Sequence, residues 1–461
     1  MERKVKFAVI GAGSSSFGPN TVMDILLSEP FARNADIEIY LMDISQNALD
    51  LSAGFCRELQ GHLNRTVTLN ASTCLKSAVE GADFVITSIE VDRHHHWSQD
   101  FHIPKRFGFR QVYGENGGPG GMFHFLRNVG PLHEIAKTME AYCPDAWLLN
   151  FTNPEAKLIE AVSKMSTVKC VGLCHGIGMA EEQLSGFLEI PAEDLAIECG
   201  GLNHFCWVTK LTHAVTGEDL YPLLREKESK AQWLAQWDEL ALPRLLFRTF
   251  GLYPYPGTNH VGEYIAWGED MLASRMMQYF YDPAECDPWK TRRTPDYIYS
   301  LSSHPTGRPL FTEERAGQRD AAYVRSFTLK EREIKKSGEF AIPIAEAITF
   351  DAAVSIGAVN IPNKGYISNI PDGTVVELPA VADGRGLHPK NIGPLPVGIA
   401  CMIHQQGCIH QLLVEAYREK SRNKLLQALL VDPTVSTYHN AVMLINTMCD
   451  MQKDILPELS W

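Results

Sequence analysis

The sequence predicts an α/β fold, with a doubly wound parallel sheet first and a mixed α+β domain after it. Short β-rich runs alternate with stretches of helical periodicity through residues 1–180, a pattern typical of parallel strands joined by helical crossovers. Longer helix-like stretches and irregular loops replace this alternation over residues 181–461. The chain has 461 residues, 45% of them hydrophobic, which suits two domains around a large core. We therefore expect one domain over residues 1–180 and a second over residues 181–461.

Six β-rich runs are the expected strands of the first domain: residues 5–13, 36–43, 67–73, 83–89, 146–152 and 168–174. Residues 19–29, between the first two runs, carry apolar residues at helical spacing and predict a crossover helix. In the second domain, residues 232–250 predict a helix. Residues 352–380 predict a pair of strands with Pro362–Gly365 at their turn.

Charge and composition narrow the class of partner. The formal net charge is −13 with acids and bases mixed along the chain, so nothing marks a nucleic-acid surface and we expect a small-molecule substrate. No segment holds about eighteen uninterrupted apolar residues, and no cleavage site follows the N-terminus, so we expect a cytoplasmic protein without a membrane span. Eleven cysteines stand without a CxxC pair, which predicts reduced thiols.

The turn after the first predicted strand has the composition of a dinucleotide-binding turn. Gly11 and Gly13 allow a tight turn and close approach of a pyrophosphate to the backbone, and Ser14 and Ser15 follow at the start of a helix. Serine replaces the third glycine of the usual pattern, and an ordinary strand-to-helix turn is the alternative. Asp43, at the end of the second predicted strand, can accept the ribose hydroxyl hydrogens and would repel a 2′-phosphate, which favours NAD over NADP.

Three polar motifs follow apolar runs, at residues 150–155, 174–176 and 201–205. Parallel sheets bind ligands at the carboxyl ends of their strands, so these motifs should lie close together in one binding site at that edge of the sheet. Thiolate and imidazole from Cys174, His175 or His204 then form a divalent-metal ligand set, although inert packing is the commoner role of such residues. A Cys-His nucleophilic pair is the competing interpretation. Adjacent residues on a strand point to opposite faces, which argues against Cys174 and His175 as that pair.

Seven motifs in this order together resemble glycoside hydrolase family 4: the GxGS opening, GGPGGMFHFLRNV (117–129), NFTNP, CHG, GLNHF, HVGEY (260–264) and residues 359–380. That family consists of NAD- and divalent-metal-dependent glycosidases. The resemblance implies a Rossmann-like domain followed by an α+β domain that resembles the C-terminal domain of lactate and malate dehydrogenases. It also implies a homodimer or homotetramer.

The resemblance further implies a mechanism. In the family, NAD takes hydride from C3 of the sugar, a base removes the C2 proton, and the C1 substituent leaves by elimination. Cys174 and His204 resemble the metal ligands, with Mn²⁺ as the usual ion, although thiolate is softer than Mn²⁺ ordinarily prefers. Tyr264 resembles the base, and its phenol needs a nearby cation or the metal to ionise at neutral pH. Asn153 resembles the asparagine that contacts the sugar hydroxyls, and a helix cap is its alternative role.

Residues near these motifs suggest the substrate. His175 is a candidate general acid, and Arg127 a candidate ligand of an anionic or polar substrate, although a structural arginine fits equally. CHG resembles the motif of the α-glucuronidase subgroup. It therefore favours an unphosphorylated α-linked substrate, with an α-glucuronide as the first candidate. An α-galactoside, an α-glucoside or an α-galacturonide is the alternative substrate. Arg325 and Lys364 are further candidates for a carboxylate partner.

Two other classes of protein fit parts of this pattern. A plain NAD-dependent sugar or hydroxyacid dehydrogenase shares the expected fold but needs no thiolate ligand. A non-enzymatic NAD-binding regulator would also share the dinucleotide turn.

Overall fold

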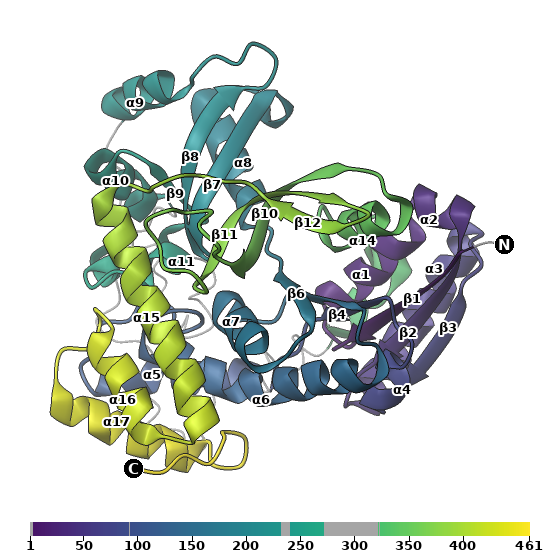
Figure 1. Cartoon of the computed structure of the whole chain (residues 1–461), viewed down its shortest axis with the longest axis horizontal. Coiled ribbons are helices and arrows are strands. Elements are labelled where there is room, and N and C mark those ends of the chain that lie inside the picture. Colours follow the sequence, from purple (N-terminus) through teal and green to yellow (C-terminus); the bar gives the residue numbers. More distant parts are fainter. Residues whose placement is uncertain (1–2, 92, 232–239, 272–320, 322) are drawn as a thin grey trace.

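The computed structural model of the protein describes residues 3–91, 93–231, 240–271, 321 and 323–461. Within these ranges the strands form one twelve-stranded sheet in the order β3-β2-β1-β4-β5-β6-β10-β11-β7-β8-β9, with β12 paired to β11 (Figure 1). The α/β fold class predicted from the sequence is confirmed.

The N-terminal half of the sheet is parallel, as the alternating pattern predicts. The order changes direction between β1 and β4, and ligands of open α/β sheets bind at such a switch point. All six predicted runs overlap a strand of this half: β1 (Arg3–Ile10), β2 (Ala35–Met42), β3 (Thr68–Ser72), β4 (Phe84–Thr87), β5 (Trp147–Asn150) and β6 (Lys169–Gly172).

Helices cover both faces of this parallel half. Ala8 and Ile10 of β1 pack in one core cluster with α6 (Gly118–Tyr142). Phe7 and Val9 pack in another cluster with α1 (Phe17–Leu26) and α14 (Ala341–Phe350). Because neighbouring residues of one strand pack in different clusters, both faces of the sheet are buried, and the sheet is doubly wound as predicted.

The second half of the sheet is antiparallel and joins the first half edge to edge. The predicted strand pair is confirmed as β10 (Val354–Pro362) and β11 (Val375–Asp383). Asn360 of β10 pairs with Gly172 of β6, and Glu377 of β11 pairs with Gly201 of the next strand. The remaining strands are β7 (Leu195–Leu202), β8 (Phe205–His213), β9 (Tyr253–Tyr255) and β12 (Gly386–Pro389).

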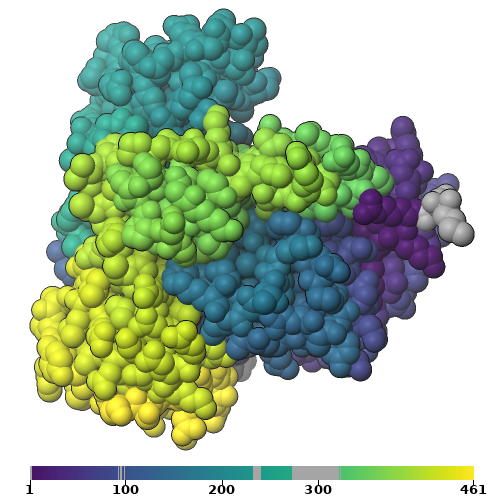
Figure 2. All heavy atoms as spheres, viewed as in Figure 1, coloured from purple at the N-terminus to yellow at the C-terminus, as the bar shows by residue number. Residues whose placement is uncertain are grey.

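Three C-terminal helices, α15 (Val397–Glu419), α16 (Arg422–Val431) and α17 (Tyr438–Met451), contribute buried residues to the first core cluster, and α15 contacts α6. Figure 2 shows the end of the chain, in yellow, and the first strand, in purple, at opposite ends of the face in view. The other α-helices in the described residues are α2 (Glu29–Asn34), α3 (Gln46–Leu63), α4 (Leu75–Val79), α5 (Arg93–Arg106), α7 (Glu155–Met165), α8 (Gly176–Leu188), α9 (Tyr221–Lys230), α10 (Ala241–Phe250) and α11 (Thr258–Gly262).

Some expectations about single elements need correction or stay open. The tight turn expected at Pro362–Gly365 is wrong: β10 ends at Pro362, but β11 begins only at Val375, because Asn363 holds the intervening loop through Ile367 and Ile370. Of the predicted helix 232–250, residues 232–239 lie outside the described residues, and α10 covers 241–250. The boundary at residue 180 falls inside α8 and stays a prediction.

None of the helices in the described part of the chain combines the length and hydrophobicity that a membrane crossing requires.

Candidate active site

The glycine turn between β1 and α1 is shaped for close backbone approach. Gly11 has φ +81°, and a Cβ there would collide with the carbonyl oxygen of Ser88. A Cβ on Gly13 would lie 2.5 Å from Cβ of Ala48 and 2.7 Å from Oδ2 of Asp43. Both positions therefore require glycine.

Asp43 lies against this turn, as the sequence predicts. Its Oδ2 accepts a hydrogen bond from the N–H of Gly13 at 2.8 Å, and its Oδ1 accepts one from the N–H of Ser45 at 2.9 Å. Ser14 Oγ accepts from the N–H of Phe17 at 3.3 Å, at the start of α1. The structure thus brings the predicted dinucleotide residues together, and their contacts with a cofactor stay a prediction.

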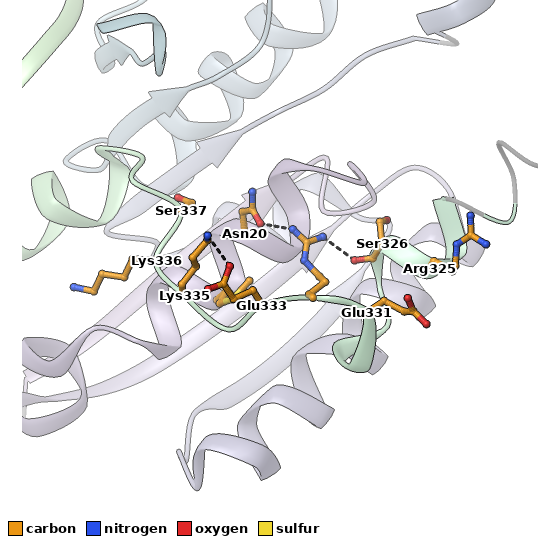
Figure 3. Close-up of a pocket in the computed structure, with 10 residues that line it drawn as sticks. Asn20, Arg325, Ser326, Glu331, Glu333, Lys335, Lys336 and Ser337 are labelled. Carbon is orange, nitrogen blue, oxygen red and sulfur yellow. Dashed lines mark hydrogen bonds and ion pairs between the residues drawn. The ribbon is translucent and has the colours of Figure 1, made fainter. Parts of the chain in front are cut away.

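The segment after residue 322 also reaches the turn, which the sequence did not indicate. Tyr323 Oη donates to the carbonyl oxygen of Gly13 at 2.8 Å, and Arg332 donates to that of Ser15 at 3.4 Å. A cavity of about 540 Å³ lies between this segment and α1 (Figure 3). Charged side chains line it, including Arg325, and Glu333 and Lys335 pair across 2.6 Å. This cavity is separate from the polar motifs described next, since none of their residues lines it.

The motif GLNHF is the tip of the β7–β8 hairpin. Leu202 pairs with Phe205, so Asn203 and His204 form a two-residue turn, and His204 has φ +62°. The turn presents two side chains. The Asn203 amide donates to Oε2 of Glu377 at 3.2 Å. His204 Nδ1 lies 2.9 Å from Nδ2 of Asn116.

His204 faces a second imidazole and a carboxylate. The rings of His204 and His260 lie 4.4 Å apart at 82°. One ligand atom from each of Glu115, His204 and His260 lies within 4.8 Å of the others. Burial lowers the pKa of both imidazoles, so they are neutral at pH 7 and keep a lone pair for a cation.

The loop before α6 carries Glu115 and Asn116, and Glu263 holds it. The carboxylate of Glu263 accepts from the N–H of Glu115 at 2.6 Å and from that of Asn116 at 3.0 Å. Burial raises the pKa of Glu263 to about 8, against the opposing effect of these backbone donors. Arg93 forms an ion pair with Oε1 of Glu115. The motifs 117–129 and 260–264 thus meet here, and a Cβ on Gly117 would lie 2.6 Å from Cβ of Glu263.

Cys174 and His175 lie just after β6 and face different surroundings. Cys174 is half-buried, and burial followed by the nearby Glu377 raises the pKa of its thiol, whereas hydrogen bonds from Gly176 and Asn203 lower it. His175 is exposed, and its Nδ1 lies 3.4 Å from Oε1 of Glu339, which raises the pKa of the imidazole. Among the described residues, the three-residue ligand group around His204 does not include Cys174.

Tyr264 is buried beside the hairpin tip. Its Oη donates to the carbonyl oxygen of Asn203 at 3.3 Å, and its ring stacks on Phe205 at 5.0 Å. Burial, followed by the carboxyl groups of Glu263 and Glu115, raises the pKa of this phenol. Lys157 Nζ lies 5.7 Å from the ring centroid and donates to the carbonyl oxygen of Asn116. Sequence reasoning missed Lys157, whose only signal was a lysine on the apolar face of a helix.

Two predicted substrate residues have structural partners. The carbonyl oxygen of Asn153, after β5, accepts from Nδ2 of Asn128 at 2.8 Å. Arg127 is fully buried and pairs with Asp100 at 2.7 Å and with Gln452 at 3.1 Å. Arg127 therefore has the structural role that was its alternative to substrate binding, and its contact with a substrate stays a prediction.

Two further carboxyl groups were missed. Glu377 is 1% exposed and accepts from Oη of Tyr255 at 2.6 Å and from Nδ2 of Asn360 at 3.2 Å. Glu155 is also 1% exposed, and neither of its oxygens has a hydrogen-bond partner within the ranges that the structure describes. Burial, followed by Glu377, raises the pKa of Glu155 well above its usual range.

Comparisons with known proteins cover nearly the whole chain. Residues 6–190 match the sequence model described as Family 4 glycosyl hydrolase, and residues 199–435 match that of the Family 4 glycosyl hydrolase C-terminal domain. An alpha-glucosidase of Erwinia rhapontici is 30% identical, over 97% of this chain and 98% of that protein. An alpha-galacturonidase of Thermoanaerobacter italicus is 27% identical, over 98% of this chain and 97% of that protein.

A solved structure shares the fold. The 6-phospho-alpha-glucosidase from gut microorganisms, solved in complex with NAD and Mn²⁺, superposes with a TM-score of 0.77 at 21% identity. The match covers 99% of this chain and 100% of that one.

Proposed function

Because the chain belongs to family 4 of the glycosyl hydrolases, we propose that it hydrolyses unphosphorylated α-linked glycosides with NAD and a divalent metal as cofactors. The observation that carries this proposal is the gathering of Cys174, Asn203, His204 and Tyr264 around one hairpin tip. This tip belongs to the same sheet as the glycine turn.

The residues of the glycine turn fit NAD. The turn leaves no room for a Cβ at Gly11 or Gly13, which allows a pyrophosphate to approach the backbone closely just before α1. Asp43 supplies the carboxylate for a ribose. The 6-phospho-alpha-glucosidase that shares the fold was solved with NAD and Mn²⁺, which supports the same pair of cofactors here.

The donor set around the hairpin tip fits a divalent metal. His204 is neutral and engages Asn116 through Nδ1, and no hydrogen bond occupies its Nε2 in the described part of the chain. Cys174 offers a thiol beside Asn203, which hydrogen-bonds to it. When bound, NAD accepts a hydride from the sugar C3 and the metal acts as a Lewis acid on the resulting carbonyl.

Side chains of this protein then carry the proton transfers. Tyr264 takes the C2 proton through Oη, which the carbonyl oxygen of Asn203 holds in place. Burial raises the pKa of the phenol, so ionisation of Tyr264 requires the metal charge. His175 gives a proton to the leaving group, and Asn153 contacts the sugar hydroxyls.

The substrate we favour is an α-glucuronide. This choice rests on Cys174-His175-Gly176 and is supported by the uronate-specific name of the Thermoanaerobacter relative. The relative named alpha-glucosidase makes a neutral α-glucoside the second candidate. The hydrolysis rates of a panel of 4-nitrophenyl α-glycosides, assayed with NAD⁺ and Mn²⁺, rank these two candidate substrates.

Solvent isotope labelling tests the chemistry. Hydrolysis in D₂O should place deuterium at C2 of the released sugar, because the base exchanges its proton with solvent before returning it. Tyr264→Phe should bind substrate but turn over about 10²–10⁴-fold more slowly, as expected for a lost general base. Protium fully retained at C2 would exclude this route, and steady accumulation of NADH would instead indicate a dehydrogenase.

A further inference from the structure

Lys157, in the first turn of α7, is a cation enclosed by the protein. The residue is 2% exposed, and its Nζ donates to the carbonyl oxygen of Asn116. Within the ranges that the structure describes, no carboxylate oxygen lies within 4.0 Å of this nitrogen. An ammonium group has three donors, and a lysine is rarely buried without a partner for its charge. Lys157 can therefore pair with a bound anion.

The position of Lys157 is beside the proposed catalytic base. Its Nζ lies 5.7 Å from the ring centroid of Tyr264. Burial lowers the pKa of His204 most, and the positive charges of Lys157 and Arg93 lower it further, so both cations lie near the hairpin tip. Arg93 differs from Lys157 because it forms ion pairs with two carboxylates. Lys157 is thus the better candidate for a charged group of the substrate.

Lys157 carries its charge at neutral pH. Burial lowers its pKa to about 8, although the charges of Glu263, Asp432 and Glu160 raise it. A group with this pKa is mostly protonated at pH 7. The three carboxyl groups have other partners: Glu263 and Asp432 accept hydrogen bonds, and Glu160 pairs with Lys164 at 2.6 Å.

The three cations that the sequence suggested for a carboxylate lie in other surroundings. Arg127 pairs with Asp100 at 2.7 Å. Arg325 lines the cavity beside α1 (Figure 3), which is separate from the polar motifs. Lys364 is exposed in the loop between β10 and β11. Lys157 is better placed than these three for a carboxylate bound next to Tyr264.

We propose that Lys157 binds the carboxylate of a uronic acid substrate and so selects uronides over neutral glycosides. The reaction on that substrate rests on the proposed function. A carboxylate accepts a charge-assisted hydrogen bond from the ammonium group. A neutral sugar has a hydroxymethyl group in place of this carboxylate and leaves the buried charge unpaired, which disfavours its binding.

Isothermal titration of D-glucuronate and D-glucose into the full chain tests the proposal. The protein is loaded with Mn²⁺ and NADH, which cannot accept a hydride. It should bind glucuronate about thirtyfold more tightly than glucose, the low end of the effect of a buried charge pair. Lys157→Met keeps an unbranched side chain without the charge, and it should remove this preference.

The matched control is Lys164→Met, because Lys164 lies on the same helix with a partly exposed side chain and pairs with Glu160. This variant should keep the preference for glucuronate. An equal preference in Lys157→Met and the parent overturns the proposal, as does a parent that binds both sugars alike. Failure of every glycoside to turn over, with a glucuronate preference that Lys157→Met loses, instead removes the proposed function alone.

A crystal structure of the unaltered protein with glucuronate avoids any folding defect of a variant. A carboxylate oxygen of the sugar should lie about 2.7–2.9 Å from Nζ of Lys157, the usual length of a charge-assisted hydrogen bond. A carboxylate held by a different cation overturns the proposal and leaves hydrolysis of the glycoside untouched.

Discussion

At Gly172, the last residue of β6, the absence of a side chain makes room for Glu155. A Cβ added there would fall on the carboxyl group of Glu155, which is buried and has no hydrogen-bond partner among the described residues. Gly172→Ala should therefore lower the free energy of unfolding by about 1–3 kcal/mol, the usual cost of overpacking a core. Chemical denaturation measures this change.

Gly178→Ala is the matched control for this substitution. Gly178 lies within α8, and a Cβ there would meet no atom within 4 Å. Alanine also has the higher helix propensity, so this variant should be at least as stable as the parent. Equal stability of Gly172→Ala and the parent would mean that Glu155 moves away at no cost.

His175 should set the alkaline limb of the pH–rate profile. Its hydrogen bond with Glu339 raises the pKa of the imidazole above 6.5, and a general acid works only while protonated. Activity should therefore fall as pH rises through this raised pKa. Glu339→Gln should move the limb to lower pH, and His175→Asn should abolish it.

The control for the pH profile is His388→Asn. His388 is another surface histidine beside a carboxylate, with its Nε2 2.8 Å from Oδ1 of Asp383. Its removal should leave the profile unchanged. A limb that persists in His175→Asn would assign leaving-group protonation to another residue.

The predictable part of the site consists of residues whose role depends on nearby sequence. Gly11, Gly13 and Asp43 follow from strand ends and glycine spacing, and the structure brings them together. Tyr323 and Glu377 were missed because their partners lie far away in the chain. No periodicity in one sequence records such long-range contacts.

Among the elements, the β7–β8 hairpin depends on the conformation of His204. This residue has φ +62°, a left-handed conformation that asparagine tolerates and β-branched residues do not. His204→Val should destabilise the protein by about 1–2 kcal/mol more than His204→Asn, and both should lose Mn²⁺ binding. Thermal unfolding measures the effect on stability, and a separate metal titration measures the effect on Mn²⁺ binding. Equal stability of the two variants would show that the left-handed conformation of residue 204 does not limit stability.

The six strands of the parallel half were predictable as elements because their β-rich runs are separated by helical stretches, whereas β7, β8, β9 and β12 were not predicted. The loop between β10 and β11 was not, because Pro362–Gly365 has the composition of a tight turn. Asn363 instead donates to the carbonyl oxygens of Ile367 at 3.1 Å and Ile370 at 2.7 Å. This side chain closes a longer loop that local turn rules do not describe.

For the whole molecule, the continuous sheet predicts cooperative unfolding. Strands β10 and β11 pair with β6 on one side and β7 on the other, so neither half of the sheet is complete alone. Calorimetry should show one transition, and NAD⁺ at about 100 times its Kd should stabilise the whole chain by about 2.7 kcal/mol. Two transitions, of which NAD⁺ raises the temperature of only one, would show that the two halves of the sheet unfold independently.

The same strand order has a consequence for synthesis on the ribosome. Gly172 of β6 leaves the ribosome long before its partner Asn360, so the edge of β6 waits unpaired while the intervening chain is made. At about 5–20 residues per second, this wait lasts on the order of ten seconds. An open strand edge is a template for pairing with another chain, so nascent copies on one messenger RNA are exposed to aggregation throughout that interval. Slower translation of the segment between β6 and β10 should therefore lower the soluble yield, whereas chaperones that cover strand edges should restore it.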